Sequence, residues 1–143
     1  MKPFSFRLDS ILNYRNYLEK RAQRNLVNAI NEYRGLEREI ERLSKKRIEI
    51  AGKCSEEGLR GMDVPKYHIY RFFLQKVTDD LERANMSLEK TEEKIKKKKA
   101  VLKGESIKKK TLETLKDSQL KKHMLRLETE EQKTLDELVI MKR

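Results

Sequence analysis

The sequence predicts an all-α protein: a long two-helix antiparallel coiled-coil hairpin in which the C-terminal helix overhangs the first helix. In two long stretches, apolar residues alternate at spacings of three and four, which indicates a left-handed coiled-coil seam. A cluster of glycines separates the two stretches. The composition agrees, because 41% of the 143 residues are charged, 36% are apolar and none is tryptophan. Such a chain cannot build a thick globular core, but it can fill a narrow seam between helices.

The first helix is expected from about residue 8 to residue 51, or as far as residue 57. Its seam consists of small, aromatic and aliphatic residues with one arginine, namely Leu8, Ile11, Leu18, Ala22, Leu26, Ala29, Tyr33, Leu36, Ile40, Leu43, Arg47 and Ile50. The steps from Leu18 to Ala22 and from Ala22 to Leu26 are both four. Two such steps form a stutter, which predicts a local relaxation of the supercoil.

The turn is expected over about residues 52–63, where three of the five glycines lie. Glycine favours the left-handed conformation that ends helices. Asp63 is suited to cap the N-terminus of the next helix, and Pro65 fits its first turn. This segment therefore separates the two helices.

The second helix is expected from about residue 64 to residue 141. Its seam is regular as far as Gly104 and consists of Tyr67, Tyr70, Leu74, Val77, Leu81, Ala84, Leu88, Thr91, Ile95, Lys98 and Leu102. Glycine costs about 1 kcal/mol in a helix interior, so we expect a bend or loosened packing at Gly104. The pattern then resumes with Leu112, Leu115, Leu120, Met124, Leu127, Leu135, Leu138 and Met141.

The short link makes the two helices antiparallel neighbours within a single hairpin domain, residues 1–143. At about 1.5 Å per residue, the helices span roughly 75 and 115 Å, and Leu8 lies opposite about residue 114. Residues 119–141, which we call the overhang, then have no partner in the chain although they keep an apolar stripe. An uncovered apolar stripe marks a binding site for a partner.

Aromatic residues are densest just after the turn, at Tyr67, Tyr70, Phe72 and Phe73. Phe72 and Phe73 are adjacent and cannot both point into the seam, so we expect at least one to be exposed and able to contact a partner. Phe4 and Phe6 precede the first helix. They can fold onto the open end of the hairpin or bind a partner, and both interpretations stay open.

The net charge of +11 favours anionic partners in general. The run Lys94–Lys110 contains nine lysines and one acid, Glu105. Contact with nucleic acid is one interpretation of this run. A solvated helix face is the favoured one, because the run has no arginine and no aromatic residue to stack on bases. The acids between Glu128 and Glu137 also argue against nucleic acid along the overhang. A plain structural spacer or a homodimer is a third interpretation.

No motif for catalysis, a cofactor or a metal is present. His68 and His123 are isolated, and no cysteine and histidine spacing fits a metal site. Cys54 is a single cysteine without a nearby histidine, which fits a reducing compartment and argues against a nucleophile. No phosphate-binding glycine loop and no apolar stretch of about 18 residues is present. We therefore expect a cytoplasmic binding protein without enzymatic activity or a small-molecule substrate, which meets membranes only through partners.

Three groups of residues, in order and spacing, resemble a known family over nearly the whole length. They are Phe4-Ser5-Phe6-Arg7-Leu8 with Ile11, Leu12 and Arg15; Tyr70-x-x-Phe73; and Thr114-Leu115-x-Asp117-x-Gln119 followed by Gln132-Lys133-x-x-Asp136-Glu137. With these residues the chain resembles the flagellar export protein FliJ family. The resemblance implies a stalk similar to the coiled coil of the rotary ATPase γ subunit, at the cytoplasmic face of the flagellar base.

The resemblance also implies partners in flagellar type III export. They are the hexameric export ATPase (FliI), whose assembly the stalk promotes, the export gate protein FlhA, and export chaperones that it escorts. The ATPase-binding candidates lie on the overhang and are Leu120, Met124, Leu127, Gln132, Asp136, Glu137 and Leu138. The gate-binding candidates lie nearer the turn and are Leu43, Ile50, Phe72, Phe73 and Val77. Because Leu43, Ile50 and Val77 also belong to the seam, core packing is the competing interpretation for these three.

Overall fold

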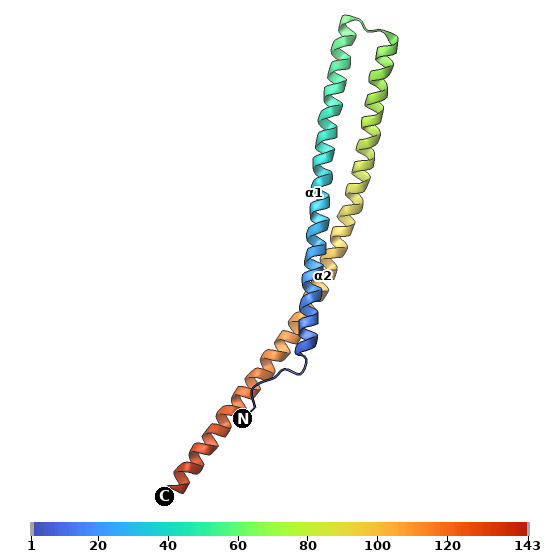
Figure 1. The fold of residues 1–143 in the computed structure, drawn as a ribbon. Coiled ribbons are helices and arrows are strands. Elements are labelled where there is room, and N and C mark those ends of the chain that lie inside the picture. The colour runs from blue at the N-terminus through green and yellow to red at the C-terminus, as the bar shows by residue number, and fades with distance from the viewer. Residues whose placement is uncertain (1, 143) are drawn as a thin grey trace. The chain divides into compact units, whose positions relative to one another are not determined.

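Residues 2–142 are described by a computed structural model with two long helices and, within this range, no strand (Figure 1). Helix α1 spans Asp9–Arg60 and helix α2 spans Val64–Met141. The predicted all-α helical hairpin is confirmed, since the two helices pack against each other. The chain falls into two compact units, one of residues 24–100 and one that joins the residues up to Gln23 with those from Val101 onward. The single domain stays a prediction.

The turn is shorter than the expected segment of residues 52–63. Helix α1 continues through the first two glycines of the cluster, and only residues 61–63 separate it from α2. Gly61 has a φ of 89°, and its N–H donates to the Gly58 carbonyl at 3.3 Å. A helical glycine costs about 1 kcal/mol, which is too little to end a helix that packs along a partner. The helix ends where the chain needs the left-handed conformation, and Asp63 then precedes α2 as expected.

In the unit of residues 24–100, the seam forms the predicted narrow core. Leu43, Val77 and Leu81 are its buried centre, at 5%, 4% and 9% exposure. All of the expected α2 seam residues from Tyr70 to Lys98 are buried or half-buried, whereas Tyr67 is exposed. The regular part of the predicted seam is therefore confirmed except at Tyr67 and Arg47, which are exposed, and the apolar contacts along it hold α1 against α2.

Two polar contacts join α1 and α2 at one level of this unit. The Tyr33 hydroxyl of α1 donates to Glu92 Oε1 of α2 at 3.2 Å, and this bond raises the pKa of Tyr33. The Lys94 ammonium donates to Glu32 Oε2 at 3.1 Å. These pairs join positions about 60 residues apart in the chain, so they fix which turn of α1 lies beside which turn of α2.

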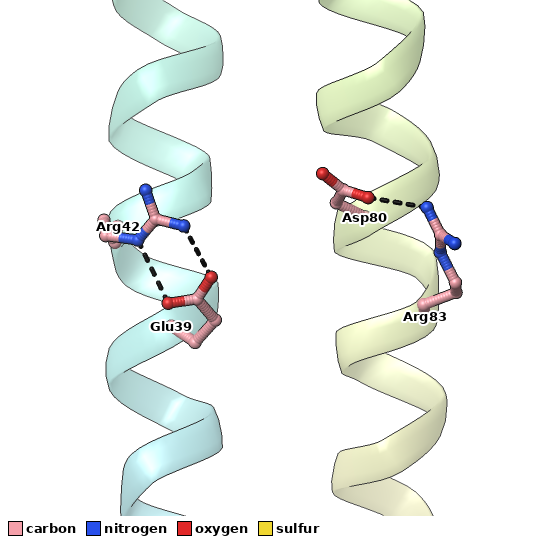
Figure 2. A network of polar contacts seen from close by, with 4 residues as sticks. All are labelled: Glu39, Arg42, Asp80 and Arg83. Atoms are coloured by element: carbon pink, nitrogen blue, oxygen red, sulfur yellow. Dashed lines mark hydrogen bonds and ion pairs between the residues drawn. The ribbon is translucent and has the colours of Figure 1, made fainter.

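Two arginine–carboxylate pairs lie on facing stretches of the helices, one on each (Figure 2). Arg42 donates twice to Glu39, at 3.0 and 2.6 Å, and Arg83 donates to Asp80 at 2.6 Å. The hydrogen bonds from Arg42 lower the pKa of the Glu39 carboxyl. Both pairs are within one helix and exposed, so solvent screens them and each adds little to the stability of its own helix.

In the other unit, the seam follows a different phase from the one expected at the start of α1. Ile11 is 47% exposed, whereas Leu12 is half-buried. From Leu12 the less exposed positions continue through Arg15 and Glu19 to the buried Ala22. These steps alternate three and four, so the placement of Ile11 in the seam was wrong, whereas the stutter residues Leu18, Ala22 and Leu26 are buried or half-buried. The apolar pattern misses this phase because charged residues occupy two seam positions.

An ionic layer of four residues, Arg15, Glu19, Glu105 and Lys109, replaces apolar packing at those positions. Lys109 Nζ lies 3.3 Å from Glu19 Oε1, and Arg15 lies 3.8 Å from Glu105 Oε2. The carboxylate side chains are only 14% and 18% exposed. Within the described chain, Glu105 Oε2 accepts no hydrogen bond. Helix α2 passes through the neighbouring Gly104 without a break.

The segment of residues 2–8, which we call the arm, folds back along α2 (Figure 1). Phe6 is its anchor, at 4% exposure, and the Phe6 carbonyl accepts the Asp9 N–H at 3.1 Å. The Phe4 ring packs on the His123 ring with centroids 5.6 Å apart. Both phenylalanines therefore fold onto the open end of the hairpin, which was one of the two interpretations left open. The arm covers α2 beyond the start of α1, as far as His123.

Candidate functional site

The overhang loses its cover after the arm ends. Leu120 and Leu127 are half-buried, whereas Met124 is 56% exposed. Every described residue from 128 to 142 is exposed. Beyond Leu127 the exposed apolar side chains are Leu135, Leu138, Val139, Ile140 and Met141. About four turns of α2 thus present apolar side chains to solvent. Exposing this apolar surface to water is unfavourable, and a partner that covers it removes that cost.

Leu127, Glu130, Glu131, Thr134 and Leu135 lie within about two turns of one another on this single helix. Two carboxylates therefore lie beside two leucines on this surface. This arrangement suits a partner whose apolar contacts are bordered by cations.

The polar ATPase-binding candidates lie on the same exposed stretch. The Gln132 side-chain amide donates to Asp136 Oδ1 at 3.2 Å, and Glu137 follows on the next position. The structure therefore places Gln132, Asp136, Glu137 and Leu138 on the exposed stretch of residues 128–142, which we call the distal overhang. Leu120 and Met124 lie nearer the arm, about three turns back along α2.

The gate-binding candidates separate into core and surface residues. Leu43 and Val77 are buried against each other, and Ile50 packs on the edge of their cluster. Phe72 and Phe73 are 66% and 47% exposed, with ring centroids 5.9 Å apart in an edge-to-face arrangement. Only the phenylalanine pair is free to contact a partner while the hairpin stays closed.

Sequence reasoning missed several exposed apolar residues around the turn. They are Ile48, Leu59, Val64 and Ile69, exposed by 73%, 89%, 67% and 56%. All four lie outside the seam, so an apolar residue at an off-seam position was the signal that could have identified them. Together with the phenylalanine pair they make the turn end of the hairpin apolar.

A three-residue polar contact closes the turn end. Lys66 Nζ lies 2.8 Å from Glu57 Oε2. The neighbouring Lys66 ammonium, and then the Tyr70 hydroxyl, lower the pKa of the Glu57 carboxyl, and the carboxylate raises the pKa values of Lys66 and Tyr70. Because Glu57 is on α1 and the other two are on α2, this contact holds the first turns of α2 beside the end of α1.

The lysine run Lys94–Lys110 is partly neutralised. Of its nine lysines, Lys94, Lys108 and Lys109 have an acidic partner within 4 Å in the described chain. The others extend from the α2 surface, and no aromatic residue lies among them. The run therefore has the character of a solvated helix face rather than of a base-stacking surface.

No group of three or more metal-ligating side chains occurs among residues 2–142. Cys54 is a half-buried free thiol on α1. None of the described helices is long and apolar enough to cross a membrane.

Comparison with known proteins identifies one family. The family model described as "Flagellar FliJ protein" matches residues 4–142, which is nearly the whole chain. No curated protein and no solved structure matches the chain. The match includes the arm from Phe4 onward, both helices and the overhang.

Proposed function

Because the chain belongs to the FliJ family of flagellar type III export components, we propose that it is a non-catalytic stalk that binds and activates the export ATPase (FliI). The observation that carries this proposal is the distal overhang. Its apolar side chains, Leu135 and Leu138 among them, extend into solvent on a single helix with no other part of the described chain beside them. A single helix of this kind can enter a narrow opening, such as the centre of a hexameric ring.

The chemistry of the overhang indicates how the ATPase would hold it. The leucines supply apolar anchors, and the exposed Glu130, Glu131 and Asp136 supply negative charge on the same stretch of helix. We therefore infer a partner surface with apolar pockets bordered by lysines or arginines. Charged rims of this kind set the orientation and speed of docking, while the buried anchors hold the complex together.

The proposal is tested by ATP turnover. The purified chain is titrated into the export ATPase of the same cell, at concentrations where the ATPase is only partly assembled. We expect turnover to rise with added chain, and the chain alone to hydrolyse no ATP. Turnover that stays constant at every ratio contradicts the proposal.

We also propose that the turn end faces the export gate protein FlhA, at the cytoplasmic face of the flagellar base, and that the stalk escorts export chaperones there. The support is the exposed phenylalanine pair in the first turns of α2, near the turn of the hairpin. Of the five gate candidates, Phe72 and Phe73 are the contacts that we assign to the gate, with Ile50 at their edge. Leu43 and Val77 act by packing the core beneath them.

Replacing both Phe72 and Phe73 by serine is expected to weaken binding to the gate protein by roughly tenfold or more, the size of a lost aromatic anchor. Binding is measured with immobilised gate protein. The matched control replaces Tyr14 and Tyr17 by serine, because these aromatics are 57% and 52% exposed. Equal losses in the two double variants would sink the assignment.

A further inference from the structure

A cationic pocket lies between the arm and α2, and neither the seam nor the proposed ATPase contact accounts for it. Its volume is ≈ 470 Å³. The arm contributes Lys2 and Ser5, and α2 contributes Gln119, Lys122 and Arg126. Phe4 and His123, packed on each other, form the wall where the two elements meet.

The arm is held firmly enough to form one side of such a pocket. Phe6 is buried between the arm and α2, and the Lys116 ammonium lies 6.0 Å from the centroid of its ring. The same ammonium lies 2.9 Å from Asp9 Oδ1, at the first turn of α1. The backbone bond from Asp9 to Phe6 closes the turn between the arm and α1. The arm therefore contacts both helices. These contacts place Lys2, at the start of the arm, beside α2.

The charge of the pocket is unbalanced. Its wall includes Lys2, Lys122 and Arg126 and no acidic residue. Among the described residues none of these three cations has a carboxylate within 4 Å, in contrast to Lys109 and Lys116 earlier on the same helix. Three cations that line one pocket without a carboxylate partner repel one another, and a bound anion relieves this repulsion.

We propose that this pocket binds a polyphosphate group, either free or as part of a nucleotide. A single carboxylate would neutralise only one of the three cations, whereas a di- or triphosphate neutralises them together. The guanidinium of Arg126 can bind two phosphate oxygens at once, and the two lysines supply mobile point charges. Ser5 and Gln119 add neutral donors at the same wall.

The Phe4–His123 pair provides a way to distinguish a nucleotide from a free polyphosphate. Aromatic side chains stack on nucleobases, so a nucleoside triphosphate can gain a contact that inorganic triphosphate lacks. Phe4 is half-buried and uncharged. Replacing it therefore removes the aromatic ring without changing the charge of the pocket.

The test is calorimetric titration of the full chain, in low salt without Mg²⁺, with inorganic triphosphate and separately with ATP. We expect saturable binding of one triphosphate per chain. Replacing Lys122 and Arg126 together by glutamine is expected to weaken binding by about tenfold or more, since two charge-assisted contacts are lost. Tighter binding of ATP than of triphosphate, abolished in Phe4→Leu, assigns the pocket to nucleotides. Equal binding of the two assigns it to the phosphate chain alone.

The control replaces Lys97 and Lys99 by glutamine, which removes the same charge from the exposed lysine run. This control is expected to bind triphosphate like the unchanged chain. Binding that is absent, or that falls equally in both double variants, overturns the proposal. Circular dichroism verifies that each variant keeps its helices. The measurement needs no ATPase, so its result is independent of the proposed export function.

Discussion

A chain that ends at Arg126 is expected to bring ATP turnover back to the level of the export ATPase alone, while its hairpin melts like that of the full chain. The truncation removes residues 127–143, of which every described residue after Leu127 is exposed. It keeps His123, the partner of Phe4, and Lys116, the partner of Asp9. The lost stretch therefore contributes contacts to a partner but little to the folded hairpin.

Two substitutions in the full chain make this result specific. Replacing Leu135 and Leu138 by aspartate removes the apolar anchors and leaves the helix length unchanged. Anchors at an interface are each worth about 2 kcal/mol, so the concentration needed for half-maximal stimulation is expected to rise more than tenfold. The control replaces Val27, 53% exposed on α1, by aspartate. If the truncated chain stimulates as well as the full chain, the ATPase contact lies on the hairpin instead.

Val77→Asp is expected to destabilise the hairpin by about 3 kcal/mol or more, because it places a carboxylate without a partner in an apolar cluster. Val77 is 4% exposed and packs with Leu43 and Leu81. The measurement is urea denaturation followed by circular dichroism at 222 nm. The same substitution at Val101, which is 54% exposed on the same helix, is expected to change stability by less than about 0.5 kcal/mol. Equal midpoints for the two variants would contradict the assigned core.

The apolar pattern predicted the fold because one repeated interaction, the packing of a seam, builds most of it. The same pattern was wrong where the seam is not apolar. Arg15 and Glu19 occupy seam positions because Glu105 and Lys109 face them, and a search for apolar spacing placed Ile11 there instead. The turn was predicted too long, since glycine content alone does not locate a helix end.

The candidate surfaces were predictable to a lesser degree. Counting residues across the hairpin predicted the overhang, because helix length depends only on residue number. Spacing placed Val77 in the seam and left Phe72 and Phe73 off it, and the structure agrees, with Val77 at 4% and Phe73 at 47% exposure. The cationic pocket was not predicted, because Lys2 and Arg126 meet only when the arm folds back along α2.

The ionic layer near the arm has a mechanical consequence. Two helices joined by leucine and alanine alone can slide along each other by one heptad, because each new neighbour resembles the old one. Such a slide would move Lys109 away from Glu19 by about 10 Å and leave Lys109 with only Glu113 of its own helix, at 3.7 Å. The pair therefore opposes shear between α1 and α2, and a force applied along one helix is carried by both.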